Sequence, residues 1–402
     1  MAHNSLMVVV ACIFVLLVLS GSLGETNFLH PSPSPSVSPS PTPHGGGGGS
    51  TPTPNPTATP TPTPIHTPSP SPTSTPTLTP TPAPVTSGLT WLHTVGKALK
   101  NDQGQTVILH GAAFGGLGES GLTYWNGGKS NLERMMQQYV FLSGGKANVI
   151  RACTSNVFGW GHPEVFDAAL DDLVSLAGQN HIYVVVEFHG VAWGSLEVQR
   201  LKSNPADWIN WFLHFVNRYK SNPVVAGFEI WNEPSSSDFT QVQWRNIAAQ
   251  CYNAIHTANP RALVIVASVP FGSVSQDWVN HPLGSQVVYG WDNYEKDWST
   301  YWTDPYVAGD ASGGRAMTQY FLDTYVFGNA SRANLPTWGT EFGWYMTEPA
   351  WSQNMNDYLA YLGVQAVNYY VFWWWSNPSN LGLAASNYNG LSPQGQIWAA
   401  NL

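Results

Sequence analysis

Apolar residues from about position 100 onward gather in short β-branched runs, separated by longer stretches with helical spacing. Eight such runs occur, at residues 107–111, 148–152, 182–189, 224–233, 262–268, 286–290, 336–342 and 367–375. Most gaps repeat apolar residues three and four positions apart, over 131–140, 163–177, 205–219, 240–257, 315–327 and 351–362. Only the gap between the fifth and sixth runs lacks a clear helical stretch. The pattern predicts buried strands that alternate with helices.

Eight buried strands with intervening helices predict an α/β protein, a (β/α)8 TIM barrel over residues 87–402. A doubly wound open sheet has the same alternation, so periodicity alone leaves it as the structural alternative. Before the first run, residues 89–106 contain the turn sequence Asn101-Asp102-Gln103-Gly104. This stretch predicts a short N-terminal hairpin that closes the floor of the barrel.

The first residues of the chain have the pattern of a secretory signal. An apolar run spans residues 6–19, and Ser22-Leu23-Gly24 follows it with small residues at the −3 and −1 positions of a signal peptidase site near Gly24. The run is too short for an ordinary membrane span, so residues 1–24 are interpreted as a cleaved signal peptide. No Lys or Arg precedes the run, which leaves an uncleaved signal anchor as the alternative. We expect a secreted protein, or one tethered at the cell surface.

Residues 25–86 form a Pro/Ser/Thr/Gly-rich segment. Nineteen of the 31 prolines lie between positions 31 and 84, and no charged residue occurs between Thr26 and Gly96. Such a segment cannot build a core, so it predicts a disordered tail with extended, semi-rigid character. It would be the remnant of a lost module or a stalk that holds the folded domain off a surface.

Composition narrows the class of ligand. Charged residues make up only 10% of the chain, against about 25% in typical proteins, and the formal net charge is −9. This balance excludes a nucleic-acid binder. The 19 Trp and 17 Tyr residues suit a surface that stacks on neutral rings such as sugars. Twelve histidines lack metal-ligand spacing, and the glycine pattern 116–121 is not followed by a helix, so no metal and no cofactor are predicted. After signal removal, two cysteines remain and are expected to pack as apolar residues.

Polar and aromatic side chains lie where the predicted strands end, which is where a barrel of this kind carries its chemistry. They are Arg151, His189, Asn232, Glu233, Tyr294, Glu341 and Trp375. Glu233 and Glu341 are 108 residues apart, the length of three βα units, so their carboxylates are expected to face each other across the barrel mouth. Two facing carboxylates indicate a general acid and a nucleophile that cleave a glycosidic bond. Arg151 is the candidate partner that keeps the nucleophile charged.

The motifs around these residues resemble glycoside hydrolase family 5, the family of many cellulases and mannanases. Trp231-Asn232-Glu233-Pro234 is similar to the acid/base motif of the retaining barrel enzymes, and Thr340-Glu341-Phe342-Gly343 to their nucleophile strand. The Trp91-Leu92-His93 hairpin, Asn148-Val149-Ile150-Arg151, Phe188-His189 and Trp375-Ser376 also match, so the resemblance covers nearly all of residues 87–402.

The resemblance implies roles residue by residue. Glu233 would be the acid/base and Glu341 the nucleophile of a double displacement. Asn232 would bind the 2-hydroxyl of the sugar in the cleavage subsite, and Arg151 and Tyr294 would contact the nucleophile. His189 would line the cleavage subsite, and Trp375 would be its platform.

Two positions depart from the family pattern. The sixth strand has Asp292 where the family usually has His, which puts a carboxyl group near the acid/base and could raise its pKa. The third strand has Glu187 where Asp is more usual. The first departure leaves open a non-catalytic carbohydrate-binding barrel on a surface stalk.

Aromatic residues after the predicted strands indicate the substrate. Candidates for the lining of a cleft are Trp125, Trp160, Trp193, Trp291, Trp298, Trp302 and Trp344, about half of which should be structural. An open aromatic cleft favours internal cleavage of a β-1,4-linked polysaccharide. We expect an endo-β-1,4-glucanase, with a β-mannanase and then a xylanase as alternatives. It would be a monomer whose partner is the β-glucan or mannan substrate, with no obligate protein partner.

Overall fold

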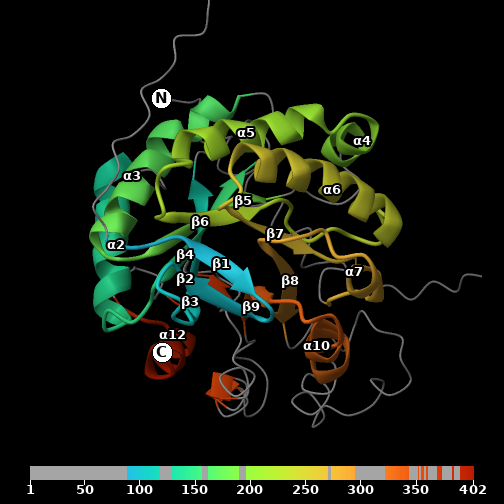
Figure 1. Ribbon diagram of the computed structural model, residues 1–402. Coiled ribbons are helices and arrows are strands. Elements are labelled where there is room, and N and C mark those ends of the chain that lie inside the picture. Colours follow the sequence, from blue (N-terminus) through green and yellow to red (C-terminus); the bar gives the residue numbers. More distant parts are fainter. Residues whose placement is uncertain are drawn as a thin grey trace, which may run out of the picture. The chain divides into compact units, whose positions relative to one another are not determined.

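The computed structural model describes residues 88–117, 128–155, 162–189, 196–269, 273–294, 322–343, 352, 355–356, 359–360, 369–373, 383 and 390–402 (Figure 1). Contacts divide the chain into Met1–Thr75 and Pro76–Leu402, and every described residue belongs to the second unit. The predicted signal segment and linker lie outside the described residues. Within the described ranges, no helix is long and apolar enough to cross a membrane.

Eight parallel strands close a barrel in the described part of the chain, in the order β10-β3-β4-β5-β6-β7-β8-β9. The strands are β3 (Leu109–Leu117), β4 (Val149–Ser155), β5 (Tyr183–His189), β6 (Val225–Glu229), β7 (Leu263–Ala267), β8 (Val287–Tyr294), β9 (Thr337–Gly343) and β10 (Tyr369–Trp373). Each overlaps one of the eight predicted runs. The closed order confirms the (β/α)8 barrel and excludes the open sheet.

Helices ring the barrel (Figure 1). They are α2 (Gly128–Leu142), η1 (Pro163–Phe166), α3 (Asp167–Gln179), α4 (Leu196–Ser203), α5 (Ala206–Tyr219), α6 (Gln241–Ala258), α7 (Gln276–Asn280), the π-helical segment η2 (Leu322–Gly328), α10 (Asn329–Ala333) and α12 (Pro393–Ala400). Four of them depart from the prediction. Helices α4, α10 and α12 were not expected, and α7 occupies the gap that was thought to lack a clear helix. These helices span eight residues or fewer, which is too short for a clear periodic pattern.

Strand residues alternate between the barrel interior and the helices. On β5, Tyr183 and Val185 belong to the cluster inside the barrel, whereas Val184 and Val186 pack in the outer cluster against the helices. Glu187 continues the inward series and is fully buried. The interior is therefore apolar near the strand starts and charged near the strand ends, because a period of two fixes which side chains point inward.

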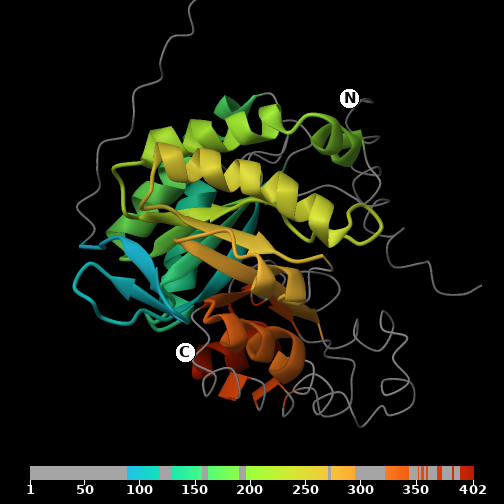
Figure 2. The same cartoon turned by 45° about the vertical axis from the view of Figure 1, so that its right-hand side comes forward.

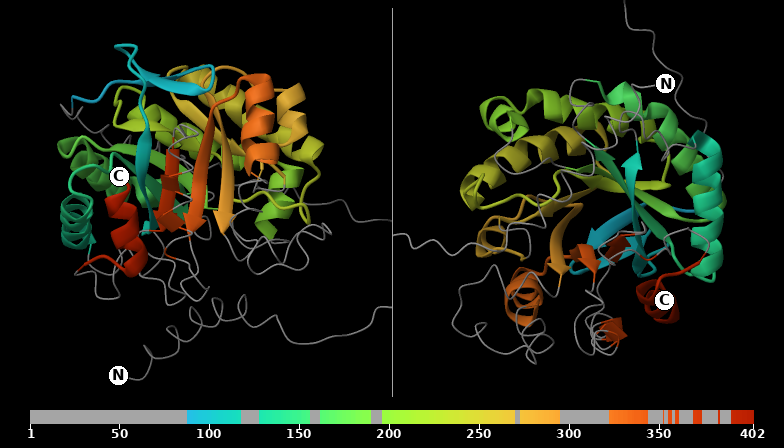
Figure 3. Two further views of the ribbon diagram at one scale, coloured as in Figure 1. Left: turned by 90° about the horizontal axis from the view of Figure 1, so that it is seen from below. Right: turned by 180° about the vertical axis from the view of Figure 1, so that it is seen from behind.

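A hairpin of β1 (Leu92–Val95) and β2 (Ala98–Asn101) covers the end of the barrel where the strands start. Leu92 and Leu99 join the interior cluster, which confirms the predicted floor. Figures 2 and 3 show the hairpin in blue at one end, with the strand arrows pointing away from it. The hairpin turns at Gly96, and the predicted turn at residues 101–104 instead leads from β2 back to Thr106.

One buried side chain ties the hairpin to the barrel. The amide oxygen of Gln286 accepts a hydrogen bond from the Thr94 N–H (2.9 Å), and its amide nitrogen donates to the carbonyls of Leu92 (3.2 Å) and Arg261 (3.1 Å). Gln286→Ala should therefore lower the free energy of unfolding by about 2–3 kcal/mol, measured by urea denaturation. The control Gln199→Ala, at an exposed position of α4, should change it by less than about 0.5 kcal/mol. Equal effects of the two variants would contradict this role of Gln286.

Candidate active site

Charged side chains gather toward the carboxyl ends of the strands. The strands point to the end of the barrel opposite the hairpin (Figure 3). Arg151 lies on β4, Glu187 on β5, Glu229 on β6 and Glu341 on β9, and each of these side chains is buried. The strand ends differ from the sequence prediction: β6 ends at Glu229, and β8 continues to residue 294. Asn232 and Glu233 thus follow their strand, whereas Asp292 and Tyr294 belong to theirs.

Arg151 is the centre of this group and has no exposed surface. Its Nε and Nη2 donate hydrogen bonds of 2.7 and 2.6 Å to the two carboxylate oxygens of Glu229. Its Nη1 donates to Oε1 of Glu341 (2.6 Å), and its Nη2 also donates to Oδ1 of Asn232 (2.9 Å). A carboxylate oxygen of Glu187 lies 3.5 Å from Nη2. Burial alone would lower the pKa of Arg151, but the surrounding carboxylates raise it well above its ordinary value.

The segment that carries Glu233 is held in place by an aromatic anchor and a backbone hydrogen bond. Trp231 is buried and stacks on Phe188, with ring centroids 5.5 Å apart. The backbone N–H of Asn232 donates to the carbonyl of Phe188 (3.1 Å), which continues the barrel beyond the last residue of β6. Glu233 then adopts a left-handed backbone with φ of 43°. Residues other than glycine rarely have this backbone conformation outside turns and functional sites, because it is strained.

Three carboxyl groups converge beside Arg151. One oxygen each of Glu233, Asp292 and Glu341 lies within 4.8 Å of the other two. Asp292 and Glu341 are paired residues on the adjacent strands β8 and β9, and Glu233 reaches the same point from the segment after β6. Carboxyl groups this close cannot all carry a charge, so the arrangement separates a charged carboxylate from a protonated one.

Burial and nearby charges together determine the protonation of the ionisable groups around Arg151. Burial would raise the pKa of Glu187, but Arg151 and His189 hold it below its ordinary value. Burial would lower the pKa of His189, but the charge and hydrogen bond of Glu187 raise it to about 9. Burial raises the pKa of Glu229 to about 7 despite its two hydrogen bonds from Arg151, because the charges of Glu187 and Glu341 add to the effect. At neutral pH, the site thus contains a guanidinium and an imidazolium beside ionised Glu187.

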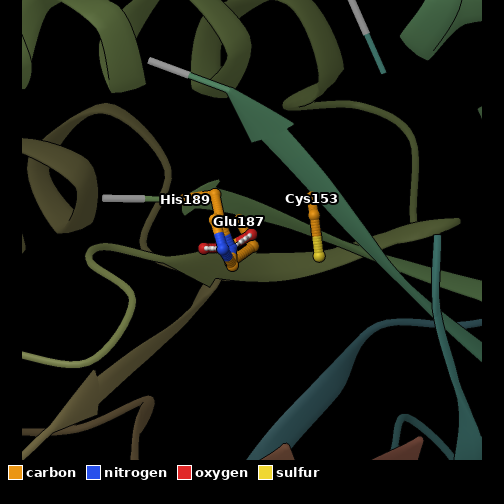
Figure 4. A group of neighbouring side chains, drawn as sticks. All are labelled: Cys153, Glu187 and His189. Atoms are coloured by element: carbon orange, nitrogen blue, oxygen red, sulfur yellow. Dashed lines mark hydrogen bonds and ion pairs between the residues drawn. The ribbon is translucent and has the colours of Figure 1, made fainter. Parts of the chain in front are cut away.

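Cys153, Glu187 and His189 form a second cluster at the same end of the barrel (Figure 4). One possible ligand atom from each lies within 4.8 Å of the others, so the three could in principle hold a metal ion. Burial and the charge of Glu187 raise the pKa of Cys153 well above its ordinary value, which keeps it a thiol. Nη1 of Arg151 lies 3.6 Å from its Sγ, so a positive charge already occupies this position. The cluster is better suited to fixing His189, whose Nδ1 lies 3.2 Å from Glu187.

The other predicted site residues fall into three groups. His189 lies at the end of β5, with about a third of its side chain (33%) exposed. Tyr294 ends β8, where only its backbone is described. Trp160, Trp193, Trp344 and Trp375 lie outside the described residues, as do Trp125, Trp298 and Trp302.

The prediction that Trp291 lines a substrate cleft is wrong. It is fully buried and packs against the helices, with its ring 5.9 Å from that of Phe327. Asp292 next to it faces the barrel mouth, and adjacent strand residues point to opposite sides. Trp291 therefore belongs to the core between barrel and helices and cannot stack on a substrate in the mouth.

Two residues of the site were missed in the sequence. Glu229 holds Arg151, and the Thr340 hydroxyl is hydrogen-bonded to Asp292. Glu229 stands inside the apolar run 224–233, and a charged residue in a buried strand requires a partner. That requirement was a usable signal. No comparable signal marks Thr340, whose contact depends on how β8 and β9 are aligned.

Comparison with known proteins assigns the family. The sequence model of the cellulase family (glycosyl hydrolase family 5) matches residues 104–380. The chain belongs to this family. It is accordingly a glycoside hydrolase, as its motifs predicted.

Known proteins resemble this family-5 chain in sequence or in fold, at low sequence identity. An endoglucanase of Paenibacillus polymyxa is 24% identical, in a match that covers 72% of this chain and 80% of that protein. A beta-glucanase from Saccharophagus degradans has a TM-score of 0.64 and 17% identity, over 81% of this chain and 97% of that one. The same beta-glucanase in complex with cellotetraose has a TM-score of 0.63 and 16% identity, with the same coverage.

The charge pairing at His189 gives a testable prediction. Glu187→Gln removes the carboxylate that stabilises the imidazolium, so the pKa of His189 should fall from about 9 by about two units or more. The shift is measured by NMR titration of the imidazole ring protons. A wild-type titration curve in the variant would show that Glu187 does not control His189.

Proposed function

We propose that this glycoside hydrolase is a retaining endo-β-1,4-glucanase, with Glu233 as acid/base and Glu341 as nucleophile. The observation that carries the proposal is the convergence of these two carboxyl groups, whose oxygens lie within 4.8 Å, beside Arg151, which donates a hydrogen bond to Glu341. Retaining enzymes have catalytic carboxyl groups about 5–5.5 Å apart, and inverting enzymes about 6.5–9.5 Å. The short separation therefore supports double displacement.

In the first step, a carboxylate oxygen of Glu341 forms a bond to the anomeric carbon. The bond from that carbon to the leaving oxygen breaks, and Glu233 gives its proton to this oxygen. In the second step, Glu233, now a carboxylate, takes a proton from water as the water oxygen attacks the anomeric carbon. The ester bond to Glu341 breaks, and the free sugar and both starting protonation states are regenerated.

Neighbouring residues suit these roles. The 2.6 Å hydrogen bond from Arg151 fixes the orientation of Glu341 and places a positive charge against its carboxylate. Because Oδ1 of Asn232 accepts from Arg151, its amide group is oriented to donate its N–H groups elsewhere. A sugar 2-hydroxyl is the acceptor that we propose for it. His189 would line the cleavage subsite as a cation.

The proposed substrate rests on the relatives and on the aromatic residues. The Paenibacillus relative is an endoglucanase, and the Saccharophagus beta-glucanase binds cellotetraose, a β-1,4-linked glucose chain. Trp160, Trp193, Trp344 and Trp375 are proposed as stacking platforms, and Tyr294 as a contact of the nucleophile. A β-mannanase remains the second candidate, because the family motifs are shared by both activities.

The place of action follows from the N-terminal pattern. We propose that residues 1–24 direct secretion, or anchor the chain at the cell surface, and that residues 25–86 act as a spacer before the catalytic domain. The enzyme is proposed to work as a monomer on an extended polysaccharide.

Substitution of the two glutamates tests their roles. Glu341→Ala should lower kcat at least ~10³-fold on every substrate, because no other group replaces the nucleophile. Glu233→Ala should lower kcat/KM ~10²–10⁴-fold on polysaccharide, but far less on aryl cellobiosides whose leaving group needs no proton. Glu164→Ala, at an exposed position, is the control. Equal losses of the Glu233 variant on both substrates would refute its acid role.

Product analysis tests the substrate. The wild-type enzyme should release a series of short oligosaccharides from cellulose and mixed-linkage glucan, with much less from mannan and xylan. A preference for mannan would favour the mannanase. Retention in a polysaccharide affinity gel without release of reducing sugar would favour the non-catalytic barrel.

A further inference from the structure

Asp292 occupies the position where the family usually has His, and it lies in the centre of the site. Only 3% of its surface is exposed. It is paired with Glu341 across β8 and β9, and one of its oxygens lies within 4.8 Å of an oxygen of Glu233 and of Glu341. A third carboxyl group therefore shares the space of the two that we assign to catalysis.

The hydrogen bonds of Thr340 can accommodate a proton on Asp292. Its Oγ1 is hydrogen-bonded to Oδ1 of Asp292 and lies 3.3 Å from the carbonyl oxygen of Trp291. A hydroxyl has one hydrogen, and a carbonyl oxygen can only accept. If Thr340 donates to the carbonyl of Trp291, both bonds form only when Asp292 carries a proton and donates it to Thr340. A protonated Asp292 therefore satisfies this network completely.

The charges around Asp292 favour the same state. Glu341 faces it from β9, Glu233 from the segment after β6 and Arg151 from β4. Burial raises the pKa of Asp292 well above its ordinary range, and the charges of Glu341 and Glu233 add to this; Arg151, and the hydrogen bond that Thr340 donates when Asp292 is ionised, act in the opposite direction. Arg151 already donates hydrogen bonds to Glu229, Glu341 and Asn232. Asp292 lacks a direct bond to this cation among the described contacts.

We propose that Asp292 is a positioning residue that holds a proton beside Glu233 and extends to higher pH the range in which Glu233 acts as the acid. The proposal rests on the proposed function of Glu233 and Glu341.

The sign of the effect follows from coupled titration. When pH rises, Asp292 loses its proton first, and its negative charge then lies beside Glu233 while Glu233 is still a carboxylic acid. That charge makes the proton of Glu233 harder to remove, so Glu233 stays protonated above the pH at which it would titrate alone. With a neutral amide at position 292, this protection is lost.

The test is the pH dependence of kcat/KM on an aryl cellobioside that requires acid assistance. Asp292→Asn keeps the shape of the side chain but cannot ionise, so the alkaline limb should move to lower pH by about one unit. Thr340→Val removes the hydroxyl partner and should also move this limb. Thr337→Val, a buried position on the same strand, should leave it unchanged. An unshifted limb in Asp292→Asn, or the same shift in Thr337→Val, would overturn the proposal.

A second measurement does not depend on activity. Infrared difference spectra between wild type and Asp292→Asn near neutral pH should contain the carbonyl band of a protonated carboxyl group. A carboxylate band in its place would contradict the proposal. Failure of the Asp292 proposal can be told apart from failure of the proposed function. If Glu233→Ala and Glu341→Ala lose activity as expected while Asp292→Asn keeps the wild-type pH profile, only the role of Asp292 is refuted.

Discussion

The buried guanidinium of Arg151 is the interaction on which the site depends. An isolated cation inside a protein is very costly, and so is a group of unpaired carboxylates. In this site the guanidinium and the carboxylates offset each other's desolvation cost, because Arg151 donates two hydrogen bonds to Glu229 and one to Glu341. The geometry of the bonds fixes Glu341 at one edge of the guanidinium. The other carboxyl groups must then share the remaining positive charge of His189 or hold protons.

The barrel makes this concentration of charge possible. Its inward side chains are apolar at the hairpin end, where Leu92 and Leu99 seal the interior. The charged side chains lie further along the strands, from the middle of β4, which carries Arg151, to the last residue of β6, Glu229. The packing of the floor thus stabilises a mouth that is unfavourable on its own. The strained backbone of Glu233 fits the same pattern, since Trp231 anchors the segment from the core side.

The eight strands and the barrel could be predicted because β-branched runs and helical spacing alternate so regularly. Strand ends could not, since apolar residues such as Trp231 continue beyond the last residue of β6. Trp291 was misplaced although the signal was present: if Asp292 faces inward, its neighbour must face outward. The contact of Thr340 with Asp292 was beyond the sequence, because it depends on a register shift between β8 and β9 at Trp291 and Asp292. How close Glu233 lies to Glu341 likewise required the folded chain.

The most direct test of the account is to trap the covalent intermediate. A 2-deoxy-2-fluoro cellobioside with a good leaving group should inactivate the enzyme, because the fluorine slows the second step more than the first. Peptide mass spectrometry should then find one glycosyl group on Glu341, the carboxylate that Arg151 orients. A label on Glu233 or Glu229, or rapid turnover of the reagent with no labelled peptide, would contradict the assignment of the nucleophile.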